Sequence, residues 1–165
     1  MGAPGNSQSV IDGARVLVVD DQPPWAEMVC AVLLAWGAKT SRATSVAEAE
    51  ALIEAMHFDM VLSDLVMPKE DGFALARWAR GHENPAIRRM PLAIMTSETS
   101  LVNIKRAQCC GADLVVEKPL KPDVLWLRMS TLLEQARDRP RSQPPCSRVL
   151  SEPCPLIPVK AQQVA

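Results

Sequence analysis

Short apolar runs alternate with longer stretches of mixed polarity along most of the chain. Four runs predict buried strands, at residues 15–19, 59–63, 91–96 and 114–117, and a weaker run at 39–43 predicts a strand nearer the sheet edge. The intervening stretches predict five helices: residues 24–36, 45–57, 72–80, 100–110 and 122–137. Strands and helices that alternate in this way indicate an α/β fold, with a parallel sheet covered by helices on both faces.

Local cues place the ends of these helices. Prolines suit the first turn of the first helix, and Gly37 suits its end. Ser45 with Glu48 three residues later forms a capping-box pattern. Residues 81–90 predict a polar connection, which contains Asn84-Pro85.

Polar side chains follow four of the predicted strands at the point where each strand ends. Asp20 and Asp21 follow the first strand, Asp64 the third, and Lys118 the fifth, while Thr96 ends the fourth. In doubly wound sheets, ligands bind beyond the carboxyl ends of the strands. With a strand order of 2-1-3-4-5, these strands are neighbours, so we expect the polar groups to converge at one sheet edge.

This set of side chains predicts a particular chemistry. Clustered carboxylates resist ionisation, and Mg²⁺ relieves their repulsion because it prefers oxygen ligands. A carboxylate can then accept a phosphoryl group, Lys118 supplies a fixed positive charge, and the Thr96 hydroxyl can donate a hydrogen bond to a phosphoryl oxygen. Each residue taken singly fits a helix cap or a turn, and we keep the turn interpretation for Asp71. The joint placement favours a site.

These motifs resemble the receiver domain of bacterial two-component response regulators. The likeness spans about residues 14–137 and rests on the following matches: Asp20-Asp21, residues 63–72, Thr96, Gly111-Ala112-Asp113 and Lys118-Pro119. The resemblance implies a flavodoxin-like fold with a five-stranded parallel sheet of order 2-1-3-4-5 and five helices.

The resemblance also implies a role for each matching residue. Asp64 would be the phosphoacceptor, and Asp64, Lys118 and Thr96 would form its catalytic set. The Mg²⁺ ligands would be Asp21 directly, Asp20 more indirectly, Asp64 and the Val66 backbone carbonyl. The Lys118-Pro119 bond would be cis. The phosphodonor would be a histidine on a histidine kinase or phosphotransfer protein, and the chain would be no enzyme beyond its own phosphorylation and dephosphorylation.

Three features depart from the family pattern or add to it. Val115 stands on the fifth strand where the family usually has an aromatic switch residue, so signal output is expected to differ while the chemistry at Asp64 survives. Trp126 and Leu133 are seven residues apart and predict an outward apolar stripe, which together with Val115 predicts a partner or homodimer surface. For Trp25, two interpretations stay open: it covers the site or faces a partner, or it packs over the first helical turn.

Composition narrows the classes of function. The net charge of −1 on 165 residues predicts no nucleic-acid or membrane-surface binding. The longest apolar run, residues 29–36, is far shorter than a membrane span, and the N-terminus does not resemble a signal peptide. The five cysteines lack a CxxC pair, which favours a reducing cytoplasm. We expect a flexible segment at 1–13, the receiver at 14–137 and a proline-rich disordered tail at 138–165.

The sequence therefore predicts a single-domain response regulator that signals to a downstream protein target. Two alternatives remain open. A degenerate receiver would act as a phosphate-independent interaction module. A Mg²⁺-dependent phosphatase would need a second acid two residues after Asp64, and that position is Val66.

Overall fold

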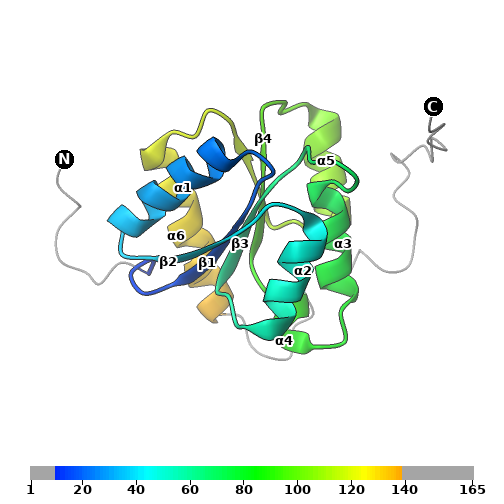
Figure 1. The fold of residues 1–165 in the computed structure, drawn as a ribbon, viewed down its shortest axis with the longest axis horizontal. Coiled ribbons are helices and arrows are strands. Elements are labelled where there is room, and N and C mark those ends of the chain that lie inside the picture. Colours follow the sequence, from blue (N-terminus) through cyan, green and yellow to red (C-terminus); the bar gives the residue numbers. More distant parts are fainter. Residues whose placement is uncertain (1–9, 139–165) are drawn as a thin grey trace.

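The computed structural model describes residues 10–138, which form a three-layer α/β domain (Figure 1). All strands of its central sheet are parallel, in the order β2-β1-β3-β4-β5. The strands are β1 (Arg15–Val19), β2 (Lys39–Ala43), β3 (Met60–Asp64), β4 (Leu92–Thr96) and β5 (Leu114–Glu117). The predicted fold class and strand order are confirmed.

Helices cover both faces of the sheet. They are α1 (Pro23–Ala35), α2 (Val46–Ala55), α3 (Gly72–Gly81), α4 (Pro85–Arg88), α5 (Leu101–Cys110) and α6 (Pro122–Asp138). One core cluster packs α1 and α6 against the sheet, and the other packs α2, α3 and α5 against the opposite face. Both β3 and β4 are buried along their full length, as expected for central strands of a sheet covered on both sides.

The prediction of five helices was one short. The additional helix, α4, has four residues and lies within the predicted polar connection 81–90. Its cause is local: the Asn84 side chain accepts a hydrogen bond from the Ala86 backbone N–H, and Pro85 occupies the first helical position. One helical turn is too short to produce a recognisable hydrophobic period.

The packed domain begins before the predicted boundary at residue 14. Ile11 belonged to the segment predicted to be flexible, yet its side chain is fully buried in the core beneath α1 and α6. The Gly13 backbone N–H also donates to Gly37 O at 2.9 Å. Residues 1–9 and the predicted tail from residue 139 onward lie outside the described part of the chain. Among the described helices, none is long and apolar enough to cross a membrane.

A buried arginine joins two helices to the sheet near the amino ends of its strands. Arg80, on α3, is 4% exposed and ion-pairs with Asp113 at 2.7 Å. Its guanidinium also donates to three backbone carbonyls: those of Gly111, Arg88 and Met90, at 2.8, 2.9 and 2.9 Å. Asp113 in turn accepts from the backbone N–H of Leu92 at 3.0 Å. This network joins α3, α4, the start of β4 and the turn before β5.

Replacing Arg80 should strongly destabilise the domain. Arg80→Ala deprives the largely buried Asp113 carboxylate of its ion-pair partner and removes one donor from three backbone carbonyls, and loss of one partner of a buried ion pair costs about 3–5 kcal/mol. Urea unfolding measures the effect. Arg77→Ala is the matched control, because Arg77 is exposed on the same helix and its guanidinium donates to the weak acceptor Cys110 Sγ at 3.4 Å, so its loss should cost about 1 kcal/mol or less. Equal, small effects of the two substitutions would contradict this role of Arg80.

Candidate functional site

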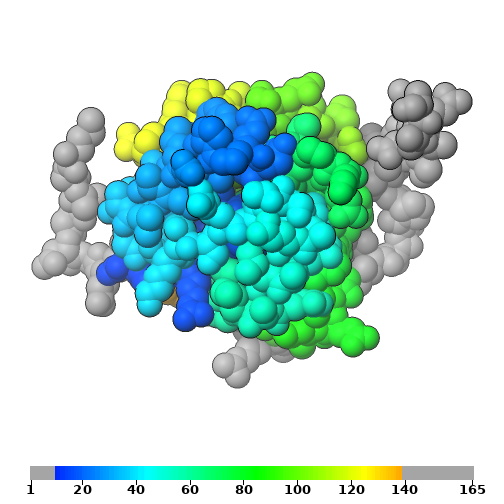
Figure 2. All heavy atoms as spheres, viewed as in Figure 1, coloured from blue at the N-terminus to red at the C-terminus, as the bar shows by residue number. Residues whose placement is uncertain are grey.

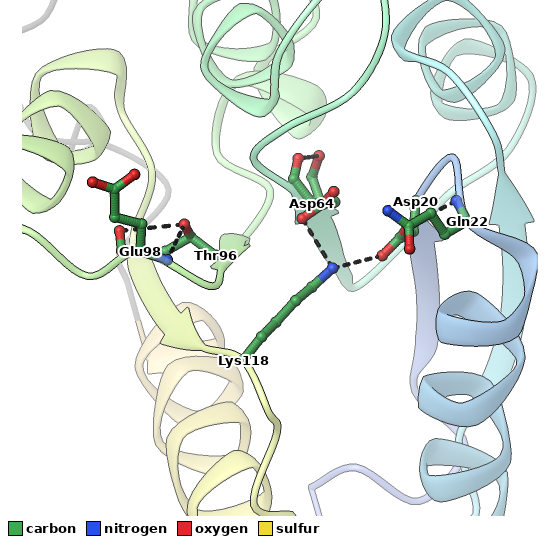
Figure 3. A network of polar contacts seen from close by, with 7 residues as sticks. Asp20, Gln22, Asp64, Thr96, Glu98 and Lys118 are labelled. Carbon is green, nitrogen blue, oxygen red and sulfur yellow. Dashed lines mark hydrogen bonds and ion pairs between the residues drawn. The ribbon is translucent and has the colours of Figure 1, made fainter.

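The predicted site residues lie at the carboxyl edge of the sheet. Asp64 ends β3 and Thr96 ends β4, while Asp20 directly follows β1 and Lys118 directly follows β5. Figure 3 shows the Lys118 side chain reaching from beyond β5 to a point between Asp64 and Asp20. The parallel register therefore brings together groups that are up to 98 positions apart in the sequence.

Lys118 forms two buried ion pairs in this space. Its Nζ lies 3.0 Å from Asp20 Oδ2 and 3.0 Å from Asp64 Oδ1. The side chains are 11% exposed for Lys118, 0% for Asp20 and 8% for Asp64, so water screens these charges poorly. The Lys118-Pro119 bond is cis, which confirms the prediction.

Three carboxylates converge beside this ammonium. One oxygen from each of Asp20, Asp21 and Asp64 lies within 4.8 Å of the other two. Asp21 Oδ1 is buried, and it has no hydrogen-bond partner among the described residues. A buried acceptor without a donor is costly unless a ligand completes it. An all-oxygen set with one unsatisfied acceptor fits a hard divalent cation such as Mg²⁺.

The pKa values of Asp64 and Lys118 are both raised, for different physical reasons. Burial raises the pKa of Asp64 above its ordinary 3.8, although the hydrogen bond from Lys118 acts in the opposite sense, and the nearby Asp20 carboxylate adds to the rise. Burial alone would lower the pKa of Lys118, but its hydrogen bonds to Asp20 and Asp64 raise it above 10.5. Lys118 is therefore a permanent cation at neutral pH.

The raised pKa of Asp64 predicts a specific pH dependence of stability. The folded protein retains the Asp64 proton to a higher pH than the unfolded chain does, so the contribution of this group is present below pH 3.8 and is lost as pH rises through the raised pKa. Without Mg²⁺, the stability of Asp64→Asn relative to the wild type should therefore increase with pH across this window. Urea unfolding at a series of pH values tests this; a difference that grows toward acid would contradict it.

The Thr96 side chain bonds Glu98 rather than the ion-paired groups, although the Lys118 backbone N–H donates to Thr96 O at 2.8 Å. The Thr96 hydroxyl accepts from the Glu98 N–H at 3.1 Å and bonds the Glu98 carbonyl at 3.3 Å. Figure 3 shows this hydroxyl turned toward Glu98 and away from Asp64. Val66 is 72% exposed, two residues beyond Asp64. The phosphoryl contact of Thr96 and the metal contact of the Val66 carbonyl stay predictions.

The interpretation of Asp71-Gly72 as a turn signal missed part of their role. Asp71 Oδ1 caps α3 by accepting from the Ala74 N–H at 2.9 Å. Gly72 packs directly on the end of β3: a Cβ built on it would lie 2.5 Å from the Asp64 carbonyl oxygen. This close approach between backbones requires glycine, and it fixes the position of the chain that follows β3.

Gly72→Ala should consequently destabilise the domain by about 1–3 kcal/mol, because its new methyl group forces the Asp64–Leu65 backbone to move. Gly81→Ala is the matched control at the other end of α3, where a Cβ would meet nothing within 4 Å. That variant should be neutral or slightly stabilised. Urea unfolding of both variants measures the difference, and equal stabilities would contradict the close approach.

The predicted partner surface is partly wrong. Trp126 is half-buried and packs on the core, and Leu133 is 2% exposed, so they do not form an outward stripe. Leu133 comes eight residues after Leu125, and this spacing places it on the buried face of α6 together with Met129 and Leu132.

The exposed apolar side chains of α6 are Val124 (44%) and Leu127 (61%). Val115 is half-buried and lines a groove of about 640 Å³ along β5, which Val124 also lines.

Comparisons with known proteins agree with this geometry. Residues 16–130 match the family model described as response regulator receiver domain. The DNA-binding response regulator MtrA of Mycolicibacterium smegmatis is 32% identical over 126 residues, covering 76% of this chain and 53% of that protein. The chain thus spans about half the length of this relative.

Solved structures show the same fold. A receiver domain of a histidine kinase from Syntrophus aciditrophicus is similar with a TM-score of 0.70 and 30% identity, over 78% of this chain and 96% of that one. The chemotaxis response regulator CheY4 of Vibrio cholerae gives a TM-score of 0.68 and 28% identity, over 73% and 98%. With its sheet order, its acidic cluster and the family match over most of its length, the chain belongs to the response regulator receiver domain family.

Proposed function

We propose that this domain is a phosphorylation switch in which Asp64 accepts a phosphoryl group in the presence of Mg²⁺. One observation carries the proposal: the Lys118 ammonium lies 3.0 Å from Asp64 Oδ1 beside three converging carboxylates, one of which has an unsatisfied buried oxygen. The donor is a phosphohistidine on a histidine kinase or phosphotransfer protein. The chain catalyses only its own phosphorylation and dephosphorylation.

Each residue has a defined part in the transfer. An Asp64 carboxylate oxygen attacks the donor phosphorus, the new O–P bond forms, and the N–P bond of the phosphohistidine breaks with its electron pair returning to the imidazole. Asp20, Asp21 and Asp64 would hold the cation, and a bound Mg²⁺ would supply positive charge against the phosphoryl oxygens. When the Asp64 carboxylate loses its charge by forming the O–P bond, the Lys118 ammonium that was paired with it pairs with a phosphoryl oxygen instead. Water later attacks the phosphorus of the acyl phosphate, the O–P bond to Asp64 breaks, inorganic phosphate is released and the carboxylate is restored.

Thr96 connects the chemistry to a conformational change in this proposal. Its hydroxyl is engaged with Glu98, so a contact with the phosphoryl group requires it to leave that partner. Such an exchange would shift the segment that leads from β4 into α5. Val115 occupies the strand position of the family's aromatic switch residue, so the output depends on this segment more than on a ring rotation.

The partners and location follow from the same proposal. We infer a cytoplasmic protein that signals through contacts with a downstream protein. The relative MtrA is named a DNA-binding regulator and is about twice as long as the matched region. Its DNA binding is a property of the full-length relative and is not assigned to this chain. The single-domain organisation, the absence of nucleic-acid binding and a homodimer stay predictions, and the homodimer no longer has an outward Trp126–Leu133 stripe to support it.

The alternative function is a phosphate-independent interaction module. Val115 and Val124, which line the β5 groove, and the exposed Leu127 on α6 favour it. Beryllofluoride, which mimics a phosphoryl group on a carboxylate, separates the two functions. The switch predicts a change in tryptophan emission with beryllofluoride and Mg²⁺ together and none when either is omitted. No change under any condition, with no phosphate uptake from acetyl phosphate, would favour the interaction module.

A further inference from the structure

Lys118 has a third contact that the phosphorylation chemistry does not use. Its Nζ lies 5.0 Å from the centroid of the Trp25 ring, in a cation–π arrangement. The same ammonium donates to Asp20 and bridges to Asp64, and an ammonium carries three N–H groups. The ring face therefore lies beside a cation whose other contacts are the two carboxylates of the site.

The position of Trp25 is set by a stiff local segment. It is the third residue of α1, after Pro23 and Pro24, whose rings fix the backbone φ angles. The Trp25 N–H donates to Gln22 O at 3.1 Å, and the Gln22 N–H donates to Asp20 Oδ1 at 2.9 Å. The turn that carries the indole is thus bonded to one of the carboxylates that Lys118 pairs with.

The two segments also adjoin one another on the surface. The start of α1, in blue, lies beside the yellow segment that begins α6 at the top of both Figure 1 and Figure 2. Trp25 is half-buried, and Lys118 is only 11% exposed. The Trp25 indole takes the place of water on one side of the Lys118 ammonium. The quadrupole of its ring attracts the ammonium charge, which water would otherwise solvate.

We propose that Trp25 is a positioning residue that holds the Lys118 ammonium over Asp64 for phosphoryl transfer. This inference rests on the proposed function and goes beyond it. Without the ring, Lys118 would gain rotamers that point to solvent, and the transition state would lose part of its fixed positive charge. If Trp25 only packed over the first turn of α1, any apolar side chain of similar size would serve equally well.

The experiment compares the rates of phosphate uptake from acetyl phosphate with Mg²⁺. Trp25→Leu keeps apolar bulk and removes the π face, so it should slow uptake about 3- to 30-fold. Trp25→Phe keeps a ring face and should stay within about threefold of the wild type. Trp36→Leu, a half-buried tryptophan at the far end of α1, is the matched control and should leave the rate unchanged. Urea midpoints of all three variants confirm that they are folded.

Two further readouts separate positioning from packing. In a Lys118→Met background, Trp25→Leu should add no further slowing, because the cation it acts through is gone. The emission change caused by beryllofluoride and Mg²⁺ should be reduced in Trp25→Phe and retained in Trp36→Phe. A Trp25→Leu rate within twofold of the wild type, or an equal loss in the Lys118→Met background, would overturn the inference. A wild type that takes up no phosphate would instead overturn the proposed function, and this inference with it.

Discussion

Asp64→Asn is expected to abolish phosphate uptake from acetyl phosphate and Mg²⁺. The substitution keeps the size and shape of the side chain but replaces the proposed nucleophile, a carboxylate, with an amide, which cannot form an acyl phosphate. It also removes one of the three carboxylates that would hold the cation. Lys118 keeps its partner Asp20, so the fold should survive. Intact-mass measurement should show one added phosphoryl group in the wild type and none in the variant.

Asp59→Asn provides the matched control for this result. Asp59 immediately precedes β3, at the opposite edge of the sheet, where its side chain accepts from the Arg15 backbone N–H at 2.8 Å. Asp59 therefore lies one strand length away from Asp64 and contributes nothing to the site, so its replacement should leave phosphate uptake unchanged. Uptake that persists in Asp64→Asn, or that vanishes in Asp59→Asn, would place the phosphoacceptor elsewhere.

Lys118→Met should produce the second-largest effect, a loss of about 10²–10³-fold in the rate of phosphate uptake. Methionine preserves the length of the side chain and removes the charge that stabilises the developing phosphoryl oxygens, and removal of one such preorganised donor has this order of cost. The metal-free protein should also lose about 3–5 kcal/mol of stability, because the fully buried Asp20 carboxylate loses its cation.

Lys121→Met controls for the loss of a lysine from the same segment. Lys121 is exposed, three residues beyond Lys118, so its replacement should change neither the uptake rate nor the urea midpoint measurably. Mg²⁺ should partly restore the stability of Lys118→Met, since a cation bound to the native state compensates the carboxylates. A Lys118→Met variant with wild-type uptake would remove Lys118 from the chemistry.

The main features of the site could be predicted because they follow from sheet topology. Asp20, Asp64 and Lys118 each stand at the end of an apolar run, and parallel strands with order 2-1-3-4-5 bring such ends to one edge. Their convergence needed no knowledge of side-chain conformation. The same argument placed Thr96 near Asp64 but could not show that its hydroxyl bonds Glu98, because a rotamer choice is decided by local contacts.

The features that were missed depend on which face of a helix is buried, or on close contacts between segments that are distant in the sequence. Residues 124–127 are four consecutive apolar positions, which obscure the buried face of α6, and Leu133 was assigned to the wrong side as a result. The short helix α4 offers no period to detect. The contact of Gly72 with Asp64 joins separate segments and is not encoded in the spacing of residues along the chain. Trp25 covering the site was one of two interpretations left open, and its contact with Lys118 agrees with that one.

The most direct test of the central claim is to locate the phosphoryl group after incubation with acetyl phosphate. The protein is treated with and without Mg²⁺, the acyl phosphate is reduced with borohydride, and the modified residue is identified by peptide mass spectrometry. The account predicts modification at Asp64 alone, and only when Mg²⁺ is present. Modification at another residue, or equal modification of Asp64 in excess EDTA, would contradict the claim that the three carboxylates and Lys118 form a metal-dependent phosphoacceptor site.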